Sequence, residues 1–379
     1  MTENADKIRM NKGTQIANTQ NCVFRVNDVK YKVVSQSGNG AYDIENTTIG
    51  WKCTCPDHKH RGMKCKHIWA VIISLGIRQQ AKPKVIIEPI VSKYCPECGS
   101  ANIRKDGVRH NKSGDLQKYK CIDCGKWFSI NVGFEKMKNS PQTITTAIQL
   151  YFSGESLRNT MRSLEFIGIT ISHTTVNRWI EKYTGIMKTY ADNIKPNVGQ
   201  TWRADEVYVK IKGDMKYLFA LMDDETRYWI AQEVADTKYK HDARKLFNMG
   251  GEIAGKRPET LITDGLPAYR DAFNKEFYTN NKPQSQHINA IKLTGHGNTA
   301  DNNKMERING EIRDREKVMR GLKIKETPIL PGMQIYHNFI KPHEGLAGKT
   351  PSEACGIELK GENKWITLIQ NASVKVKMN

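Results

Sequence analysis

The segment TWRADEVYVKIK, at residues 201–212, decides the fold of the largest part of the chain. Its side chains alternate as they do in a strand, so Asp205 shares a face with Val207, Val209 and Ile211. A carboxylate among branched apolar side chains is costly unless a metal ion or another cation meets it. The pattern therefore predicts a half-buried strand that carries a functional acid.

Two further segments each add one acid. LITDG, at residues 261–265, is a short apolar run, which places Asp264 at the tip of a buried strand before a helix that begins near Pro267. NNKMERINGEIRDREKVMRGLK, at residues 302–323, predicts a helix with an apolar stripe. That stripe consists of Met305, Ile308, Ile312 and Met319. A second stripe places one acid in line with three cations: Glu306, Gly310, Arg313, Lys317 and Arg320.

Together, Asp205, Asp264 and Glu306 could hold two divalent cations about 3.5–4 Å apart, which would clamp the attacking and leaving oxygens of a phosphodiester. Oxygen ligands favour Mg²⁺ or Mn²⁺ over zinc. Either aspartate taken alone could be a surface acid, since the chain holds 40 Asp and Glu. The order of strand acid, strand acid and helix acid favours a metal site.

Four motifs in order give residues 201–357 a resemblance to the catalytic domain of DDE transposases of insertion sequences, which are related to retroviral integrases. They are ADE at 204–206, TDG at 263–265, the segment 302–323, and YHNFIKPHEGLAGKTPSEACGI at 336–357. The resemblance implies an RNase H-like fold and metal-dependent cleavage and transfer of DNA strands.

The same resemblance implies that Glu306 is the third acid, because N-x-x-E-R before a basic helix is the family's pattern. Glu311, one helical turn later, is a rival for this role. Asp223 and Asp224 are rivals within the hairpin, although turns commonly contain acids.

The composition is that of a nucleic-acid-binding protein. The formal net charge is +19 and the sequence pI is about 9.4. Ribosomal and membrane-surface proteins are basic as well, so charge alone does not decide. No apolar run is long enough to span a membrane, and the N-terminal residues lack the apolar core of a secretory signal. We expect a cytoplasmic, nucleoid-associated protein without a membrane partner.

Seven of the nine cysteines fall in two groups, which in a chain without a signal peptide predicts metal sites rather than disulfides. The first group is WKCTCPDHKHRGMKCKHIWA at residues 51–70. Three thiolates and one imidazole make a closed structural zinc site, formed by Cys53, Cys55, Cys65 and His67. His58 and His60 are alternatives to His67. The spacing resembles the SWIM zinc finger.

The second group pairs two C-x-x-C motifs, a strong signal for zinc held by Cys95, Cys98, Cys121 and Cys124. It resembles the zinc ribbons at the N-terminus of insertion-sequence transposases. The cations between the motifs could contact phosphates or form a solvated basic face, and both possibilities stay open. They are Arg104, Lys105, Arg109, His110, Lys112 and Lys118.

Residues 141–190 predict a helix-turn-helix, with Ser172 as N-cap of a recognition helix at residues 174–183. Three side chains are expected to pack inwards: Val176, Trp179 and Ile180. Four are expected to be free to meet DNA: His173, Thr175, Asn177 and Arg178. An ordinary three-helix bundle is the alternative.

The expected architecture is multidomain α+β, with two small zinc modules, a helix-turn-helix domain and an RNase H-like mixed α/β catalytic domain. The expected boundaries are 1–80 for the SWIM-like domain, 81–92 for a linker, 93–135 for the zinc ribbon, 138–192 for the helix-turn-helix, 198–357 for the catalytic domain and 358–379 for a tail.

The functional hypothesis is a prokaryotic insertion-sequence transposase. It would bind double-stranded element ends and target DNA as a homo-oligomer, with zinc in two structural sites and Mg²⁺ or Mn²⁺ in the catalytic site. The side chains expected to hold the DNA backbone are Arg307, Arg313, Lys317 and Arg320. A structure-specific nuclease of the same fold and a transposase-derived DNA-binding regulator are the alternatives.

Overall fold

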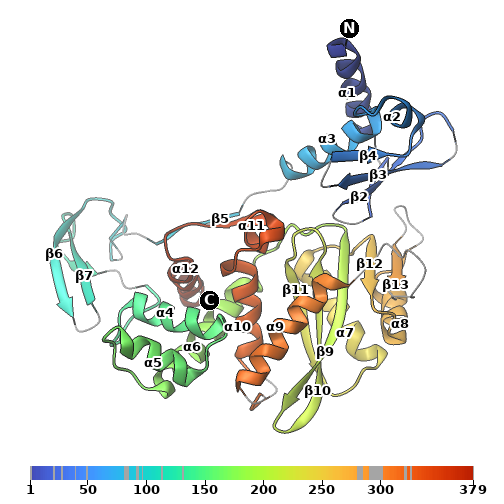
Figure 1. Ribbon diagram of the computed structural model, residues 1–379. Coiled ribbons are helices and arrows are strands. Elements are labelled where there is room, and N and C mark those ends of the chain that lie inside the picture. The colour runs from blue at the N-terminus through green and yellow to red at the C-terminus, as the bar shows by residue number, and fades with distance from the viewer. Residues whose placement is uncertain are drawn as a thin grey trace. The chain divides into compact units, whose positions relative to one another are not determined.

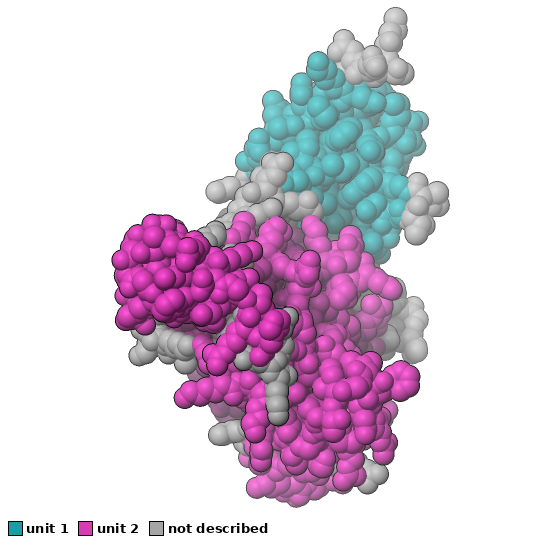
Figure 2. Space-filling view, turned by 90° about the vertical axis from the view of Figure 1, so that its left-hand side faces the viewer, with its two compact units in different colours: residues 1–83, 279–285, 293–300 teal, residues 84–278, 286–292, 301–379 magenta. Residues whose placement is uncertain are grey.

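The computed structural model describes residues 2–19, 22–26, 29–38, 40–47, 50–80, 85–90, 94–95, 97–111, 114–129, 132–279, 285–289, 302–319, 322–324 and 327–378. The chain divides into two compact units, which Figure 2 distinguishes by colour. The first is formed mainly by residues 1–83, and the second by residues 84–278, 286–292 and 301–379.

The first unit contains a four-stranded antiparallel sheet followed by two helices. The strands are β1 (Val23–Arg25), β2 (Lys30–Val34), β3 (Ala41–Thr47) and β4 (Gly50–Cys53), and the helices are α2 (Pro56–Arg61) and α3 (Lys66–Gln80). The alternating segments before residue 51 predict these strands. Ile68 and Val71 of α3 are buried in the same core as Val33 and Ile44, so this side of the helix faces the sheet.

The N-terminal helix α1 (Thr2–Asn18) was not expected from the sequence. It packs closely on α3, because a Cβ atom at Gly13 would lie 2.6 Å from the Cβ of Trp69. Ile16 is fully buried in the same core. Few of its side chains are apolar, so the helix carries little periodic signal; its stability comes from this contact.

The second unit begins with a short strand and a three-stranded antiparallel ribbon. Strand β5 (Val85–Ile87) pairs in parallel with β14 (Ile357–Leu359). The ribbon consists of β6 (Ile103–Asn111), β7 (Gly114–Cys121) and β8 (Trp127–Ser129), with β7 in the middle.

The largest sheet has the strand order β11-β10-β9-β12-β13. Strands β9 (Thr201–Ile211), β10 (Asp214–Asp223) and β11 (Trp229–Ala235) are antiparallel, whereas β12 (Thr260–Thr263) and β13 (Gln286–Asn289) extend the sheet in parallel from β9. This arrangement is that of the RNase H-like fold. Strand β9 is central, so both of its faces are covered near its start.

Helices cover the two faces of this sheet (Figure 1). Helices α7 (Lys240–Ala254) and α8 (Pro267–Glu276) lie on the face of Trp202, where a Cβ atom at Gly250 would meet Leu221 at 2.2 Å. Helix α9 (Asn303–Met319) lies on the face of Asp205. Its expected apolar stripe is confirmed, because Met305, Ile308 and Ile312 are buried and Met319 is partly buried.

The predicted helical region contains α4 (Pro141–Phe152), α5 (Leu157–Phe166) and α6 (His173–Ala191). A serine side chain caps each helix by accepting a hydrogen bond from the third residue after it. Helix α10 (Ile329–Ile335) continues into the π-helical turn η1 (Tyr336–Ile340), and the short elements η2 (Glu344–Leu346) and α11 (Pro351–Ala354) follow.

The C-terminal segment is a helix rather than a tail. Helix α12 (Lys364–Met378) buries Trp365, Leu368 and Ile369 in the core that it shares with α4 and α6. The indole nitrogen of Trp365 donates to Oε1 of Gln149 at 2.8 Å. The helical bundle therefore needs this segment for its core. Within the described residues, no helix combines the length and apolar character that crossing a bilayer requires.

Candidate active site and metal centres

The structure brings Asp205 and Asp264 together from adjacent strands. Because β12 pairs in parallel with β9 and Ile262 lies opposite Arg203, Asp264 leaves the end of β12 beside Asp205. Oxygens of the two carboxylates and of Glu206 all lie within 4.8 Å of one another. The backbone N–H of Leu266 donates to Oδ1 of Asp264 at 3.2 Å, in the turn before α8.

The electrostatics of this cluster suit a cation. Asp205 is 9% exposed, and burial together with the neighbouring Asp264 and Glu206 raises the pKa of Asp205 from 3.8 to about 7. Its two oxygens are held by the backbone N–H of Glu206 and by Nδ2 of Asn309, each at 2.9 Å. A divalent cation would relieve the charge repulsion, so the donor set fits Mg²⁺ or Mn²⁺.

Glu206 is a member of the cluster that the sequence did not identify. Its side chain is 5% exposed, and its two oxygens accept hydrogen bonds from Nζ of Lys238 and the hydroxyl of Tyr269, each at 2.8 Å. These partners come from distant positions in the chain, so no local pattern reveals them. Strand alternation separates Glu206 from Asp205, and only the tertiary structure shows that their carboxylates approach.

Glu306 lies near this cluster but does not join it. It is exposed on α9, three residues before Asn309, and residues with this spacing share a side of the helix. Among the described acids that gather within 4.8 Å, Glu206 occupies the third place. Nζ of Lys304 fixes the start of α9 by donating to Oδ1 of Asp224 at 2.8 Å.

The rival acids already have partners. Asp224 is buried between Arg203 and Lys304, and although burial opposes ionisation, these two cations lower the pKa of Asp224. Asp223 accepts hydrogen bonds from the backbone and hydroxyl of Thr226. Glu311 pairs with Lys341. These acids make contacts within the fold, and none of them belongs to the cluster of Asp205 and Asp264.

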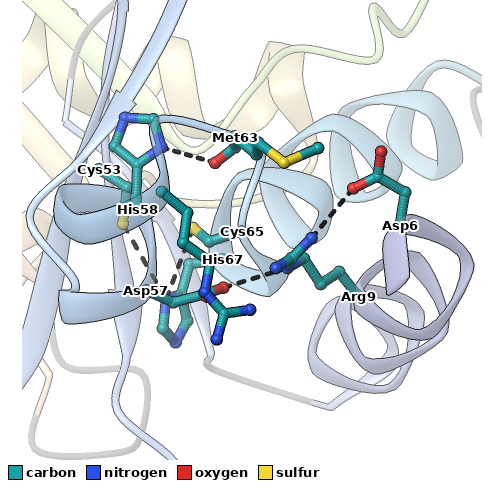
Figure 3. A network of polar contacts seen from close by, with 9 residues as sticks. Asp6, Arg9, Cys53, Asp57, His58, Met63, Cys65 and His67 are labelled. Carbon is teal, nitrogen blue, oxygen red and sulfur yellow. Dashed lines mark hydrogen bonds and ion pairs between the residues drawn. The ribbon is translucent and has the colours of Figure 1, made fainter. Parts of the chain in front are cut away.

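In the first cysteine group, the ligand atoms converge in the arrangement that zinc requires. Nδ1 of His67 lies 4.0 Å from Sγ of Cys53 and 3.9 Å from Sγ of Cys65. Figure 3 shows these three residues together. Cys55 completes a set whose atoms lie within 4.8 Å of one another. The alternative ligand His58 instead contacts the carbonyl oxygen of Met63 at 2.7 Å, so His67 is the histidine of this group.

The four sulfur atoms of the second cysteine group lie within 4.8 Å of one another. Sγ atoms of Cys95 and Cys124 lie 3.7 Å apart, and those of Cys98 and Cys121 lie 3.6 Å apart. A zinc–sulfur length of about 2.3 Å gives a tetrahedron with edges of about 3.8 Å. The four thiolates therefore fit one zinc ion.

Two family models match the chain. Residues 199–343 match the model described as a DDE domain, and residues 45–76 match the SWIM zinc finger. The chain carries a DDE domain and a SWIM zinc finger. The first match contains Asp205, Asp264 and Glu306, and the second contains all four ligands of the first zinc group.

Curated relatives of the DDE domain are proteins of insertion sequences. The chain is 27% identical over 146 residues to the transposase for insertion sequence element IS257 in transposon Tn4003 of Staphylococcus aureus, covering 38% of this chain and 63% of that protein. It is 28% identical over 191 residues to the insertion element ISM1 uncharacterized 48.3 kDa protein of Methanobrevibacter smithii, covering 47% and 46%. The chain thus spans less than two thirds of either relative.

Among solved structures, the HTLV-2 integrase catalytic core domain matches 42% of this chain and 94% of its own, with 14% identity and a TM-score of 0.30. The RNase H-like assignment of the DDE domain rests on its strand order, with an acid on the central strand and another after β12.

The two metal groups outside the DDE domain give a direct prediction. The purified protein should carry two zinc ions per chain, because one group supplies three thiolates and an imidazole and the other supplies four thiolates. Cys95→Ser should lose one ion and leave the SWIM zinc finger loaded. Elemental analysis of the parent and the variant measures this; a single zinc ion in the parent would mean that one group does not bind zinc.

Before the DDE domain, the structure supports the expected orientation of α6. Val176, Trp179 and Ile180 are buried, as predicted. Arg178 is exposed, whereas His173, Thr175 and Asn177 are partly exposed. Nδ2 of Asn177 donates to Oε1 of Glu181 at 2.7 Å. The helix runs to Ala191, beyond the expected end at residue 183, because its later turns pack on α10 and α12.

The basic side chains of α9 lie where DNA could reach them. Arg307, Arg313 and Lys317 are exposed. Lys317 pairs with Asp314 at 3.4 Å, so Arg307 and Arg313 are the better candidates for phosphate contacts. Arg320 and Lys112 lie outside the described residues.

Proposed function

We propose that this protein is a transposase that binds the ends of an insertion sequence and catalyses metal-dependent DNA strand cleavage and strand transfer. The observation that carries the proposal is the pairing of Asp205 with Asp264 at neighbouring strands of a DDE domain. The similarity to the Staphylococcus aureus transposase supports the same activity.

In this proposal Asp205 and Asp264 hold Mg²⁺ or Mn²⁺, and Glu306 is the third ligand. Glu306 fits the role better than Glu206, because both oxygens of Glu206 already accept hydrogen bonds while Glu306 is exposed. When bound, the cations supply the charge that activates water or a 3′-hydroxyl and stabilises the phosphoryl transition state. Asn309 orients Asp205, and the turn at Leu266 orients Asp264.

DNA would be held by the helix-turn-helix and by the basic side of α9. Arg178 is exposed on α6 and could meet base edges, while Arg307 and Arg313 would meet phosphates. The protein would act as a homo-oligomer, because transposition brings two element ends together. The zinc ions would be structural, holding the SWIM zinc finger and the ribbon in shape.

Arg313→Ala tests the phosphate contact. Removing one cation that neutralises a duplex phosphate should lower the slope of log K against log salt by about 0.9, equally for all sequences. Fluorescence anisotropy with duplexes at several salt concentrations measures the slope. Lys275→Ala is a matched control, because Lys275 is exposed on α8, which covers the opposite face of the sheet. An unchanged slope for Arg313→Ala would remove this residue from the interface.

The structure-specific nuclease and the DNA-binding regulator are distinguished from a transposase by the DNA products. A plasmid that carries the gene's own flanking sequences is incubated with the protein and Mg²⁺, and the DNA products are separated by size. A transposase yields joined strands, a nuclease yields only cut strands, and a regulator binds without cutting. The paired aspartates argue against the regulator, since a protein that only binds DNA has no need of clustered acids that repel DNA.

A further inference from the structure

One face of the zinc ribbon carries an aromatic ring among cations. Lys120 on β7 lies opposite Arg104 on β6 and opposite Trp127 on β8, so the three side chains form a row across the sheet on one face. Lys118 lies two residues before Lys120 and therefore on the same face. The zinc group lies at one end of these strands and holds β7 beside β8.

Trp127 is held by its edge, and its ring remains accessible. Its indole nitrogen donates to Oδ2 of Asp106 at 2.6 Å, and the side chain is 56% exposed. Nζ of Lys118 lies 5.2 Å and Nζ of Lys120 4.6 Å from the ring centroid. Oδ2 of Asp106 also lies 3.6 Å from Nζ of Lys118, so this carboxylate is already paired with a cation of the ribbon.

The opposite face of the ribbon differs. There Tyr119 and Phe128 stack on each other, with centroids 5.7 Å apart, and both are partly buried. These two rings pack on each other and form part of the small core of the ribbon. Trp127 contributes little to a core, and an exposed tryptophan surrounded by lysines is better suited to an external ligand that is both flat and negatively charged.

We propose that this face binds single-stranded DNA. A base would stack on Trp127 while Lys118 and Lys120 turn from the ring to the adjoining phosphates, and Arg104 would extend the cationic track. Duplex DNA offers the phosphates but keeps the faces of its bases stacked inside, so it gains nothing from the ring. The proposed function supplies the source of single strands, at the ends that cleavage would free.

The test compares single-stranded with duplex DNA. Full-length protein is titrated without Mg²⁺ into fluorescein-labelled 15-nucleotide oligo(dT) and into a 15-base-pair duplex. Trp127→Ala should weaken binding of oligo(dT) about tenfold and change duplex binding less than twofold, because stacking acts only on exposed bases. Trp127→Phe should keep most of the affinity. Unchanged zinc content in each variant shows that the ribbon remains folded.

Two further variants sharpen the comparison. Lys120→Ala should lower the salt slope for oligo(dT) by about 0.7, the value for one phosphate of a single strand. Phe166→Ala is the matched aromatic control, because Phe166 is 93% exposed but lies outside the ribbon; its oligo(dT) affinity should equal that of the parent. Parent-like binding of oligo(dT) by Trp127→Ala, or equal losses on single-stranded and duplex DNA, would overturn the proposal.

This result is separable from the proposed function. If Trp127→Ala weakens oligo(dT) binding but the parent never joins DNA strands, the single-strand site is supported and the transposase function is rejected. If the parent joins strands but Trp127→Ala binds oligo(dT) normally, the transposase function is supported and the single-strand site is rejected.

Discussion

Asp205→Asn should lower Mg²⁺-dependent strand cleavage by at least about 10³-fold, because it removes the charge of a proposed metal ligand from the centre of the site. Asn309 and the backbone of Glu206 can still contact the new side chain, so the local geometry should survive. Single-turnover cleavage of a duplex carrying the element end measures the effect. Asp214→Asn, at the exposed first residue of β10, should cleave at the parent rate.

The same variant carries a stability signature. Since the pKa of Asp205 rises from 3.8 to about 7 on folding, the metal-free parent loses stability as pH rises between these values, because the carboxyl is ionised in the unfolded chain and still protonated in the folded protein. Asp205→Asn removes this cost, so without metal it should melt above the parent at pH 8. Mg²⁺ should raise the melting temperature of the parent at pH 8 and not that of the variant. Equal Mg²⁺ responses would exclude Asp205 as a ligand.

Arg315→Ala should destabilise the second unit by about 2–4 kcal/mol. Arg315 is 4% exposed, and its Nη1 donates to the carbonyl oxygens of Tyr151 at 2.6 Å and Glu155 at 2.8 Å. The guanidinium also lies 3.8 Å from the ring centroid of Tyr151. One side chain of α9 therefore ties the DDE domain to the end of α4, and its loss removes two hydrogen bonds and a ring contact from a buried position.

Urea denaturation measures the free energy of unfolding for this prediction. Arg313→Ala provides a matched control on the same helix, because Arg313 is exposed two residues earlier; its change should stay within about 0.5 kcal/mol of the parent. Arg315→Lys should lie between the two, since lysine can donate to a carbonyl group but cannot stack its planar group on Tyr151. A parent-like Arg315→Ala would show that the contact does not contribute.

Local patterns in the sequence predicted the parts of the site that depend on neighbours along the chain. Strand alternation placed Asp205 on the inner face of β9, and the apolar run ending at Asp264 placed the second acid after β12. Proline at the first position of α8 marked the start of that helix as expected. Cysteine spacing identified both groups of candidate zinc ligands, because each short spacing keeps two of the ligands close together.

Contacts between distant segments were not predictable in this way. Glu206 acquires its role through Tyr269 and Lys238, and Arg315 through a helix more than 150 residues earlier. Strand β14 pairs with β5, which lies near the start of the second unit in the sequence. A basic residue such as Arg315 is assigned to the surface by composition alone, and only packing shows that it is buried.

The proposed third ligand, Glu306 on α9, can be tested by the effect of its substitution on strand cutting and joining. A plasmid with the gene's flanking sequences is incubated with Mg²⁺ and either the parent or Glu306→Gln, with Glu311→Gln as the matched control, since Glu311 pairs with Lys341 on the same helix. We expect joined strands with the parent and with Glu311→Gln, and a loss of both cutting and joining of at least about 10³-fold with Glu306→Gln. Strand joining by Glu306→Gln at the parent level would contradict the proposed site.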